Sequence, residues 1–267
     1  MAITTVKKAA VEYLVSGSIG VPHGFTTRLG GVSTGAVASM NLSVRRDSHP
    51  DNVAKNFAIL GENLGFDPQK LVLTNQIHSD IVLQVTAADH KGFNTHDYPE
   101  CDALITDRPG TALCAFTADC TPILLWDPVT GAVGAVHAGW RGTVSRIAVK
   151  TVLAMQEAYG CDPKNIHAAI GPNIGRCCFE TGEEVPAALA ESYGQEVLSL
   201  IRQGANNKYF PDLKAINALG LRRLGVAAID LSAECTKCSP DRYWSHRVHG
   251  QSRGSQGAII VCKGVTE

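Results

Sequence analysis

Two histidines and one cysteine stand in short segments whose neighbours favour turns or strand ends. His78 ends the segment 75–78, Cys120 ends the segment 117–120, and His137 begins the segment 137–142. Together they offer two imidazoles and one thiol, which can bind a zinc ion with one coordination position open or activate a nucleophilic cysteine. Either chemistry predicts that the chain is an enzyme.

The spacing of these three residues does not by itself identify a metal site. Neither a short zinc-finger spacing nor a His-Glu-x-x-His pattern is present. A buried structural cysteine and hydrogen-bonded core histidines are the competing interpretations. Ala138 and Gly139 follow His137 and would let another group approach its ring closely. The other histidines lack a comparable setting, so we expect surface or structural roles for them.

The nine cysteines are scattered along the chain. In a reducing compartment most of them are expected to be small buried hydrophobic residues. Cys235 and Cys238 form a Cys-x-x-Cys pair, as in a zinc knuckle or a redox pair, but the sequence has no second such pair. We expect five of the cysteines to be buried structural cysteines: Cys114, Cys161, Cys177, Cys178 and Cys262.

The composition is that of an ordinary globular protein. The 267 residues are 45% hydrophobic and 18% charged, enough for one large α/β domain or two small ones. Lys and Arg number 24 against 25 Asp and Glu, so no basic excess predicts nucleic-acid binding. No apolar run predicts a membrane span. The first ten residues lack the apolar core of a signal peptide, so we expect a cytoplasmic protein.

Short apolar runs predict a series of strands around the candidate residues. The turn-forming residues 127–131 predict a hairpin that brings the chain to His137 at the end of its second arm. The predicted strands are 71–73, 81–85, 103–105, 111–116, 123–126, 132–136, 166–170, 226–231 and 258–261.

Apolar residues at helical spacing predict four helices. One begins with Asp51 as N-cap and ends at Gly65, and a second runs over 144–159 and ends at Gly160. The others lie around 185–200 and 213–224. Helices and strands do not alternate strictly, which predicts an α/β (α+β) fold with a mixed sheet layered with helices.

Taken together, several segments resemble the YfiH family, also called the laccase-domain or multicopper polyphenol oxidase family. The resemblance spans nearly the whole chain, and implies one YfiH-like domain over residues 1–267. It implies an architecture similar to toxin deamidases that use a Cys–His pair. The matching segments are 24–33, 39–42, 75–78, 102–106, 117–122, 137–142, 170–174 and 235–236.

The resemblance implies that His78, Cys120 and His137 bind zinc. It implies phosphorolysis of adenosine, inosine or guanosine with phosphate, with adenosine deaminase and methylthioadenosine phosphorylase activities as further possibilities. Asp119 is expected to act as a general base, or to orient His78 or His137.

For substrate binding, Arg28 and Asn41 stand in matched segments, and phosphate is expected to contact Arg28, Arg45, Arg46 or Arg141. The sequence departs from the family pattern at Asp47-Ser48, at Ser245-His246-Arg247-Val248 and at Gly254-Ser255. These departures could remove an anion contact. The expected partners are a purine nucleoside and phosphate, and the chain is expected to be a monomer or a homodimer.

Three alternatives belong to other classes. The first is a cysteine hydrolase, or peptidoglycan editing factor, that acts on muropeptide precursors with Cys120 as thiolate and His137 as base. The second is a copper polyphenol oxidase, or laccase. The chain lacks the His-x-His pairs of a multicopper enzyme, which disfavours copper against zinc. The third is a non-enzymatic metal-binding scaffold, which would not need an open coordination position.

Overall fold

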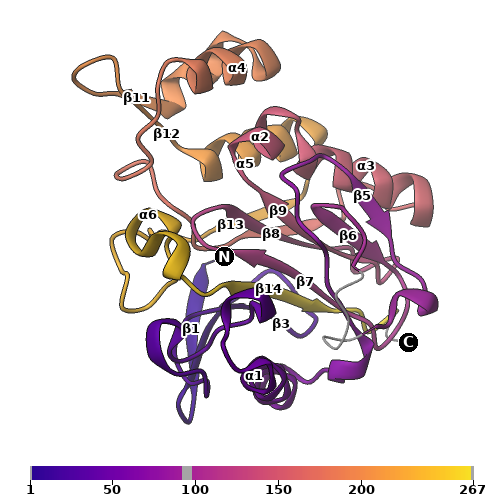
Figure 1. Ribbon diagram of the computed structural model, residues 1–267. Helices are drawn as coiled ribbons and strands as arrows, with labels where there is room; N and C mark the ends of the chain where they lie inside the picture. Colours follow the sequence, from indigo (N-terminus) through magenta and orange to yellow (C-terminus); the bar gives the residue numbers. More distant parts are fainter. Residues whose placement is uncertain (1, 92–97, 266–267) are drawn as a thin grey trace.

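A computed structural model describes residues 2–91 and 98–265 of the chain. Two six-stranded sheets pack face to face, and helices cover the outer face of each (Figure 1). The predicted α/β fold with mixed strands and covering helices is confirmed, although the strands form two main sheets rather than one. His96 lies outside the described residues.

The first sheet has the strand order β1-β2-β3-β14-β7-β4. Its neighbours are antiparallel except β4 and β7, which are parallel. Helix α1 covers its outer face, where Phe57 and Leu60 pack against Leu71 and Ile259. The strands are β1 (Ile3–Lys8), β2 (Val11–Ser16), β3 (His23–Thr26), β4 (Leu71–Val72), β7 (Ala112–Thr117) and β14 (Gln256–Val261), and the helix is α1 (Pro50–Leu64).

The second sheet has the strand order β13-β10-β8-β9-β6-β5. Its β10–β13 and β5–β6 pairs are parallel, and the others are antiparallel. The strands are β5 (Val82–Gln84), β6 (Ala103–Thr106), β8 (Thr121–Trp126), β9 (Val133–Ala138), β10 (His167–Ile170) and β13 (Ala228–Leu231). Helices α3 (Ile147–Tyr159) and α5 (Leu213–Leu224) cover its outer face.

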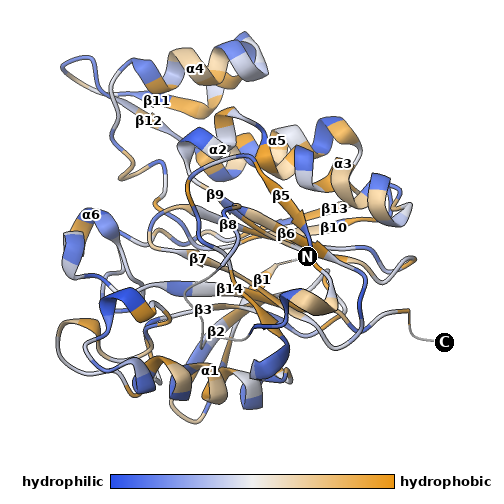
Figure 2. Cartoon of the chain, turned by 45° about the vertical axis from the view of Figure 1, so that its right-hand side comes forward, coloured by the Kyte–Doolittle hydropathy of each residue, from blue (hydrophilic) through white to orange (hydrophobic). Residues whose placement is uncertain are grey.

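The main core lies between the two sheets. Phe25 and Leu113 from the first sheet meet Leu104, Leu124 and Ala135 from the second. Each of these side chains is almost fully buried. Figure 2 shows the central strand β14 as largely hydrophobic, whereas the helices carry hydrophilic residues on part of their surface. Burial of this apolar surface drives the two sheets together.

The predicted hairpin is confirmed, because β8 and β9 pair antiparallel through the turn 127–131. Asp127 accepts hydrogen bonds from the amides of Val129 and Thr130, and Gly131 has a left-handed φ of 74°. The second arm runs to Ala138, one residue past His137. The hairpin therefore fixes His137 on a rigid strand in the middle of a sheet.

Two predicted helix boundaries are wrong. Helix α1 begins at Pro50 with His49 as N-cap, because proline fits the first helical turn, and Asp51 lies inside that turn. The predicted helix 144–159 is two helices, α2 (Trp140–Val144) and α3, separated at Arg146 with a left-handed φ of 59°. The predicted ends at Gly65 and Gly160 are confirmed, since both glycines adopt left-handed caps.

The remaining elements lie at the periphery. The predicted helical segment 185–200 breaks at Gly194, whose φ is 88°. Its parts are α4 (Glu184–Tyr193) and a 3-10 helix (Gln195–Leu200), next to the small sheet of β11 (Ile201–Gln203) and β12 (Tyr209–Pro211). Helix α6 (His246–His249) precedes β14. Further 3-10 turns are Gly35–Val37, Val44–Arg46, Pro68–Lys70, Ala87–Asp89 and Gly250–Ser252. Within the described residues, no helix combines the length and apolarity needed to span a membrane.

Candidate functional site

The structure brings His78, Cys120 and His137 together where the chain passes between the two sheets. Cys120 lies in the turn between β7 and β8, His78 in the loop between β4 and β5, and His137 near the end of β9. Cys120 Sγ lies 3.8 Å from His78 Nε2, and the two imidazole rings meet edge to face with centroids 4.9 Å apart. Their donor atoms all lie within 4.8 Å of one another.

Asp102, at the start of β6, positions both histidines. Its Oδ1 accepts hydrogen bonds from His137 Nδ1 at 2.7 Å and from the His78 amide at 3.1 Å. Its Oδ2 accepts from the amides of Ile77 and Ser79 and from the Ser79 hydroxyl. This cradle holds His78 in a left-handed conformation with φ of 61°. Asp102 is thus the shared anchor of the site, and sequence reasoning gave it no role.

The hydrogen bond to Asp102 also fixes the orientation of the His137 ring. Burial would raise the pKa of Asp102, but hydrogen bonds from His137 and Ser79 outweigh it and lower the pKa to about 2. A carboxylate that accepts a hydrogen bond from Nδ1 leaves His137 Nε2 turned toward the other donors. Once the proton on Nε2 is displaced, this nitrogen can serve as a ligand.

The thiol and the imidazole stabilise each other's charged forms. Burial would raise the pKa of Cys120, but the charge of His137 and hydrogen bonds to both histidines lower it to about 6. Burial would lower the pKa of His137, but the Cys120 charge and the Asp102 hydrogen bond raise it to about 9. Cys120 is thus suited to be a thiolate, the form required of a metal ligand or a nucleophile.

Asp119 lines a pocket beside Cys120, and two neighbouring loops hold its carboxylate by hydrogen bonds. Its Oδ1 accepts a hydrogen bond from Thr236 Oγ1 at 2.6 Å, and its Oδ2 accepts from Ser245 Oγ and the Arg247 amide. The carboxylate bonded to His137 is Asp102, so the structure lends no support to Asp119 as the group that orients this ring. Its backbone φ of 90° turns the chain sharply into Cys120.

Gly139 leaves room for the three donor groups. A Cβ atom at this position would lie 2.9 Å from His78 Cδ2 and 3.3 Å from Cys120 Sγ. The sequence predicts that Ala138 and Gly139 let another group come close. Gly139 does leave this room, and the groups that come close to it are His78 and Cys120. A side chain at this position would force the donors apart.

Two adjoining pockets meet at the three-donor site. His78, Cys120 and Arg253 line both of them. The first pocket also contains Arg45 and Arg46. The second pocket has a largely apolar wall formed by Trp140, Ile174, Phe179 and Leu213, with Arg141, His246 and Arg247 beside it. The donor groups therefore lie between two pockets that each contain three arginines, of which Arg253 is shared.

The predicted substrate-binding residues divide into two groups. Arg45 and Arg46 line the first pocket and Arg141 lines the second. Arg28 lines neither of these pockets, because it stacks on Trp244 at 3.8 Å and donates to backbone carbonyls.

Asn41 is also absent from both pocket linings and is fully buried. Its Oδ1 accepts hydrogen bonds from the amides of Ser43 and Ser255. The expected substrate contacts of Arg28 and Asn41 thus find no support in their positions. Arg253, which sequence reasoning missed, lies beside the departure at Gly254-Ser255, and its basic character was the available signal.

The prediction of five buried cysteines is right for three and wrong for two. Cys114, Cys161 and Cys262 are buried, whereas Cys177 is exposed and Cys178 is partly exposed. The latter two belong to a loop rather than a strand or helix, and face Cys235 and Cys238 from a second loop. Spacing along the sequence could not reveal this proximity.

The donor set at His78, Cys120 and His137 suits zinc. Two imidazole nitrogens and one thiolate are common zinc ligands, and three protein ligands leave a position for water or substrate. The described residues contain two clusters of at least three metal-donor side chains, and these clusters hold two histidines between them. That content does not match a multicopper oxidase centre, which agrees with the sequence-based preference for zinc.

Proteins of known name or structure match nearly the whole chain. The family model described as multi-copper polyphenol oxidoreductase laccase matches residues 22–263. A purine nucleoside phosphorylase of Deinococcus radiodurans is 41% identical over 244 residues, which cover 91% of this chain and 90% of the relative. The purine nucleoside phosphorylase YlmD of Geobacillus stearothermophilus is 35% identical, over 93% of this chain and 91% of the relative.

Solved structures agree with these matches. The crystal structure of YlmD from Geobacillus stearothermophilus superposes with a TM-score of 0.90 at 33% identity, over 97% of this chain and 98% of the other. The hypothetical protein YfiH of Bacillus licheniformis gives 0.89 at 29% identity, over 99% of both chains. The chain therefore belongs to the YfiH, or laccase-domain, family.

Proposed function

We propose that this protein is a purine nucleoside phosphorylase that acts at the junction of the two pockets. The observation that carries the proposal is the position of His78 and Cys120, which line both of the adjoining pockets. The names of the relatives in Deinococcus and Geobacillus support the same activity. The family match over residues 22–263 supports one domain for the whole chain.

The two pockets suit the two substrates of phosphorolysis. A purine ring is flat and apolar on its faces, and Trp140 and Phe179 offer aromatic surface for it in the second pocket. Phosphate requires positively charged donors, and Arg45, Arg46 and Arg253 supply them in the first pocket. The ribose then lies at the junction, where Arg253 borders both pockets.

In the proposed reaction, a phosphate oxygen forms a bond to C1′ of the ribose while the bond from C1′ to the purine nitrogen breaks. The electron pair of that bond moves to the purine, which takes up a proton, and the sugar leaves as ribose 1-phosphate. Arg45, Arg46 and Arg253 would bind the phosphate and offset its negative charge. Asp102 would keep His78 and His137 in place during the reaction.

We further propose that His78, Cys120 and His137 bind zinc. Bound zinc would supply a Lewis acid and a positive charge beside the reacting groups. The same open position would suit deamination of adenosine by water, with ammonia as the second product.

All nine cysteines are unpaired. Unpaired cysteines are usual in a reducing compartment, which supports the expected cytoplasmic location.

Product analysis tests this function. Purified protein is supplied with inosine, with or without phosphate, and the free base and ribose 1-phosphate are quantified. We expect base release only with phosphate and in equal amount to ribose 1-phosphate. Base release that is independent of phosphate, or no release at all, would contradict the proposal. Adenosine without phosphate serves as a separate assay for deamination, read out as inosine and ammonia.

A cysteine hydrolase is the second candidate, and one observation favours it. Asp102, His137 and Cys120 follow one another in the order of a Cys–His–Asp catalytic triad, with the pKa of the thiol lowered to about 6. Metal removal separates the two functions. A metal chelator should abolish phosphorolysis, whereas a hydrolase with a thiolate nucleophile would stay active on an amide substrate and be inactivated by iodoacetamide.

A further inference from the structure

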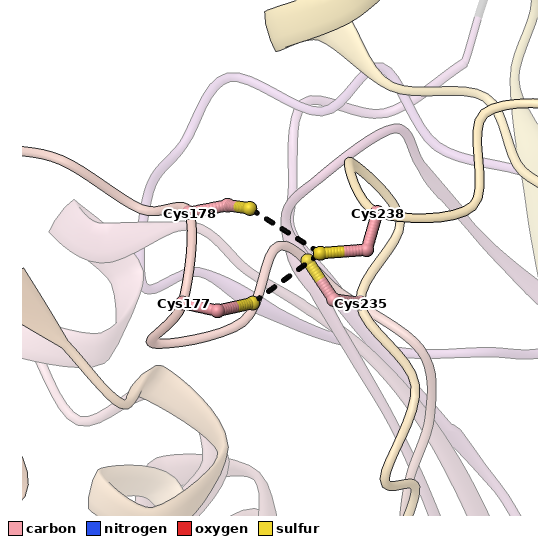
Figure 3. A group of neighbouring side chains, drawn as sticks. All are labelled: Cys177, Cys178, Cys235 and Cys238. Atoms are coloured by element: carbon pink, nitrogen blue, oxygen red, sulfur yellow. Dashed lines mark hydrogen bonds between the residues drawn. The ribbon is translucent and has the colours of Figure 1, made fainter.

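A second group of metal donors lies apart from the His78 site and is made only of cysteines. We call Cys177, Cys178, Cys235 and Cys238 the four-cysteine cluster. Figure 3 shows the first two on one loop and the last two on another, with their side chains directed toward one another. The sulfur of Cys238 lies 3.6 Å from that of Cys177 and 3.4 Å from that of Cys178. All four sulfurs lie within 4.8 Å of one another.

The fold brings the two loops together because they follow neighbouring parallel strands. Strands β10 and β13 pair in parallel, so the loops that follow them emerge at the same edge of the sheet. An isolated bridge joins Asn173 to Cys235, and the Thr236 amide donates to the Asn173 carbonyl at 3.0 Å. The proximity of the four sulfurs is therefore built into the backbone of the second sheet.

The spacing of the sulfurs matches a tetrahedral zinc site. A Zn–S bond of about 2.3 Å places two sulfurs of a tetrahedron about 3.8 Å apart. Two of the six sulfur–sulfur distances, 3.4 and 3.6 Å, lie close to this value and far from a disulfide bond, and the other four are at most 4.8 Å. None of the four cysteines is in a disulfide. A cation among the sulfurs would draw them into the tetrahedron with small rotations of their side chains.

The surroundings of Cys235 favour a thiolate at this one position of the cluster. The Gly175 amide donates a hydrogen bond to Cys235 Sγ at 3.2 Å. Lys214 is 8% exposed, donates to the Glu234 carbonyl at 2.8 Å and interacts electrostatically with Cys177 and Cys235. Four thiolates and one Zn²⁺ carry two negative charges in total, and a nearly buried ammonium group beside them offsets part of that charge.

We propose that the four-cysteine cluster binds one structural Zn²⁺. Binding replaces the sulfur-bound protons by four S–Zn bonds, releases those protons to solvent and changes no oxidation state. Four protein ligands leave no open position, so this ion holds loops together and does not bind substrate.

The zinc would hold one wall of the second pocket in position. Phe179 lines this pocket directly after Cys178, and Ile174 lines it from the same loop. On the other loop, Thr236 follows Cys235 and holds Asp119, which precedes Cys120. The two loops joined by the zinc thus reach both the apolar wall and the backbone that presents the reactive thiol.

Metal analysis of the full chain tests the proposal in a Cys120→Ala background, which removes the thiol of the other donor group. We expect about one zinc per chain, with X-ray absorption showing four sulfur ligands at about 2.3 Å. Adding Cys235→Ser and Cys238→Ser should abolish zinc retention. Adding Cys161→Ser, a buried cysteine outside the cluster, should leave it unchanged. Zinc absent from the background variant, or iron in its place, would overturn the proposal.

Alkylation of the wild-type protein tests the same site without any substitution. Cys177 and Cys238 are exposed, so as free thiols they would react readily with iodoacetamide. We expect peptide mass spectrometry to find them protected until a zinc chelator is added, and alkylated afterwards. Rapid alkylation before chelation, or a disulfide within the cluster in freshly purified protein, would contradict zinc binding. Neither measurement depends on the nucleoside activity, so the two proposals can fail separately.

Discussion

Asp102 Oδ1 accepts a hydrogen bond from His137 Nδ1 at 2.7 Å and also one from the amide of His78 at 3.1 Å. One oxygen atom therefore sets the direction of one imidazole ring and the backbone position of the other. Asp102 lines neither pocket, yet the rigidity of the candidate site depends on it.

Asp102→Asn should preserve the shape of the side chain but remove its charge. The amide nitrogen of the asparagine cannot accept a hydrogen bond, so either His137 Nδ1 or the amides of Ile77 and Ser79 would lose their acceptor. We expect zinc affinity and phosphorolysis to fall about 10- to 100-fold, measured by metal competition and by initial rates. Asp107→Asn, at an exposed position just after the same strand, is the matched control. Equal activity of Asp102→Asn and the wild type would show that the anchor is dispensable.

Gly139→Ala should damage the site while the protein stays folded. The new Cβ would lie 2.9 Å from His78 Cδ2 and 3.3 Å from Cys120 Sγ, so the donors must separate. We expect loss of metal from the site in chelator competition and a loss of turnover of about tenfold or more. Gly134→Ala, in the strand β9 that precedes Gly139, is the control, because its Cβ meets Met155 Sδ at an ordinary 3.4 Å. A fully active Gly139→Ala enzyme would be inconsistent with the tight donor packing.

Arg253→Gln should weaken phosphate binding more than nucleoside binding. Arg253 lines both pockets, and loss of a charge-assisted hydrogen bond to phosphate costs about 1.5–3 kcal/mol. We expect the KM for phosphate to rise about tenfold or more. The exposed Arg108→Gln controls for the loss of one positive charge. If the KM for nucleoside rises and that for phosphate does not, Arg253 does not bind the phosphate.

The free energy of unfolding should decrease as the pH drops below neutral, because of His23. This ring is 6% exposed, its Nδ1 bonds to the Val21 carbonyl, and its Nε2 accepts from the Ser16 amide. Burial lowers the pKa of His23 below its usual 6.5, although the Val21 hydrogen bond raises it. The unfolded chain therefore binds a proton first as the pH falls. Full stability is present above pH 6.5 and is lost as the pH falls from there through the folded pKa.

Urea unfolding at a series of pH values measures this effect. One proton contributes at most about 1.4 kcal/mol of unfolding free energy per pH unit. His23→Gln should be less stable at neutral pH, and its unfolding free energy should depend less on pH over this range than that of the wild type. Identical pH dependence in the two proteins would exclude His23 as the group responsible.

The sequence predicted elements best where one local pattern decided the outcome. The helix predicted over 213–224 coincides with the observed helix α5, which Gly225 caps. The break between α2 and α3 escaped prediction because Ser145 and Arg146 carry no local signal for a left-handed turn. The N-terminal strands β1, β2 and β3 were not predicted. The pairing of β1 with β2 is a local hairpin, whereas the pairing of β3 with distant β14 is non-local.

The site shows the same division between local and non-local information. The resemblance to the YfiH family identified His78, Cys120 and His137 as a group, which spacing alone could not do. Asp102 and Arg253 required the structure, because their importance comes from what they face rather than from adjacent residues. The four-cysteine cluster was missed for the same reason, since its two halves are far apart in the chain.

The most direct test of the central claim is phosphorus NMR of the protein with inosine and phosphate, in wild type and in Cys120→Ala. The account predicts that a sugar-phosphate signal grows in the wild type at the same rate as free base is released, while the variant produces neither. Release of base without that signal, or an unchanged rate in Cys120→Ala, would contradict a phosphorylase site built on Cys120 and its two histidines.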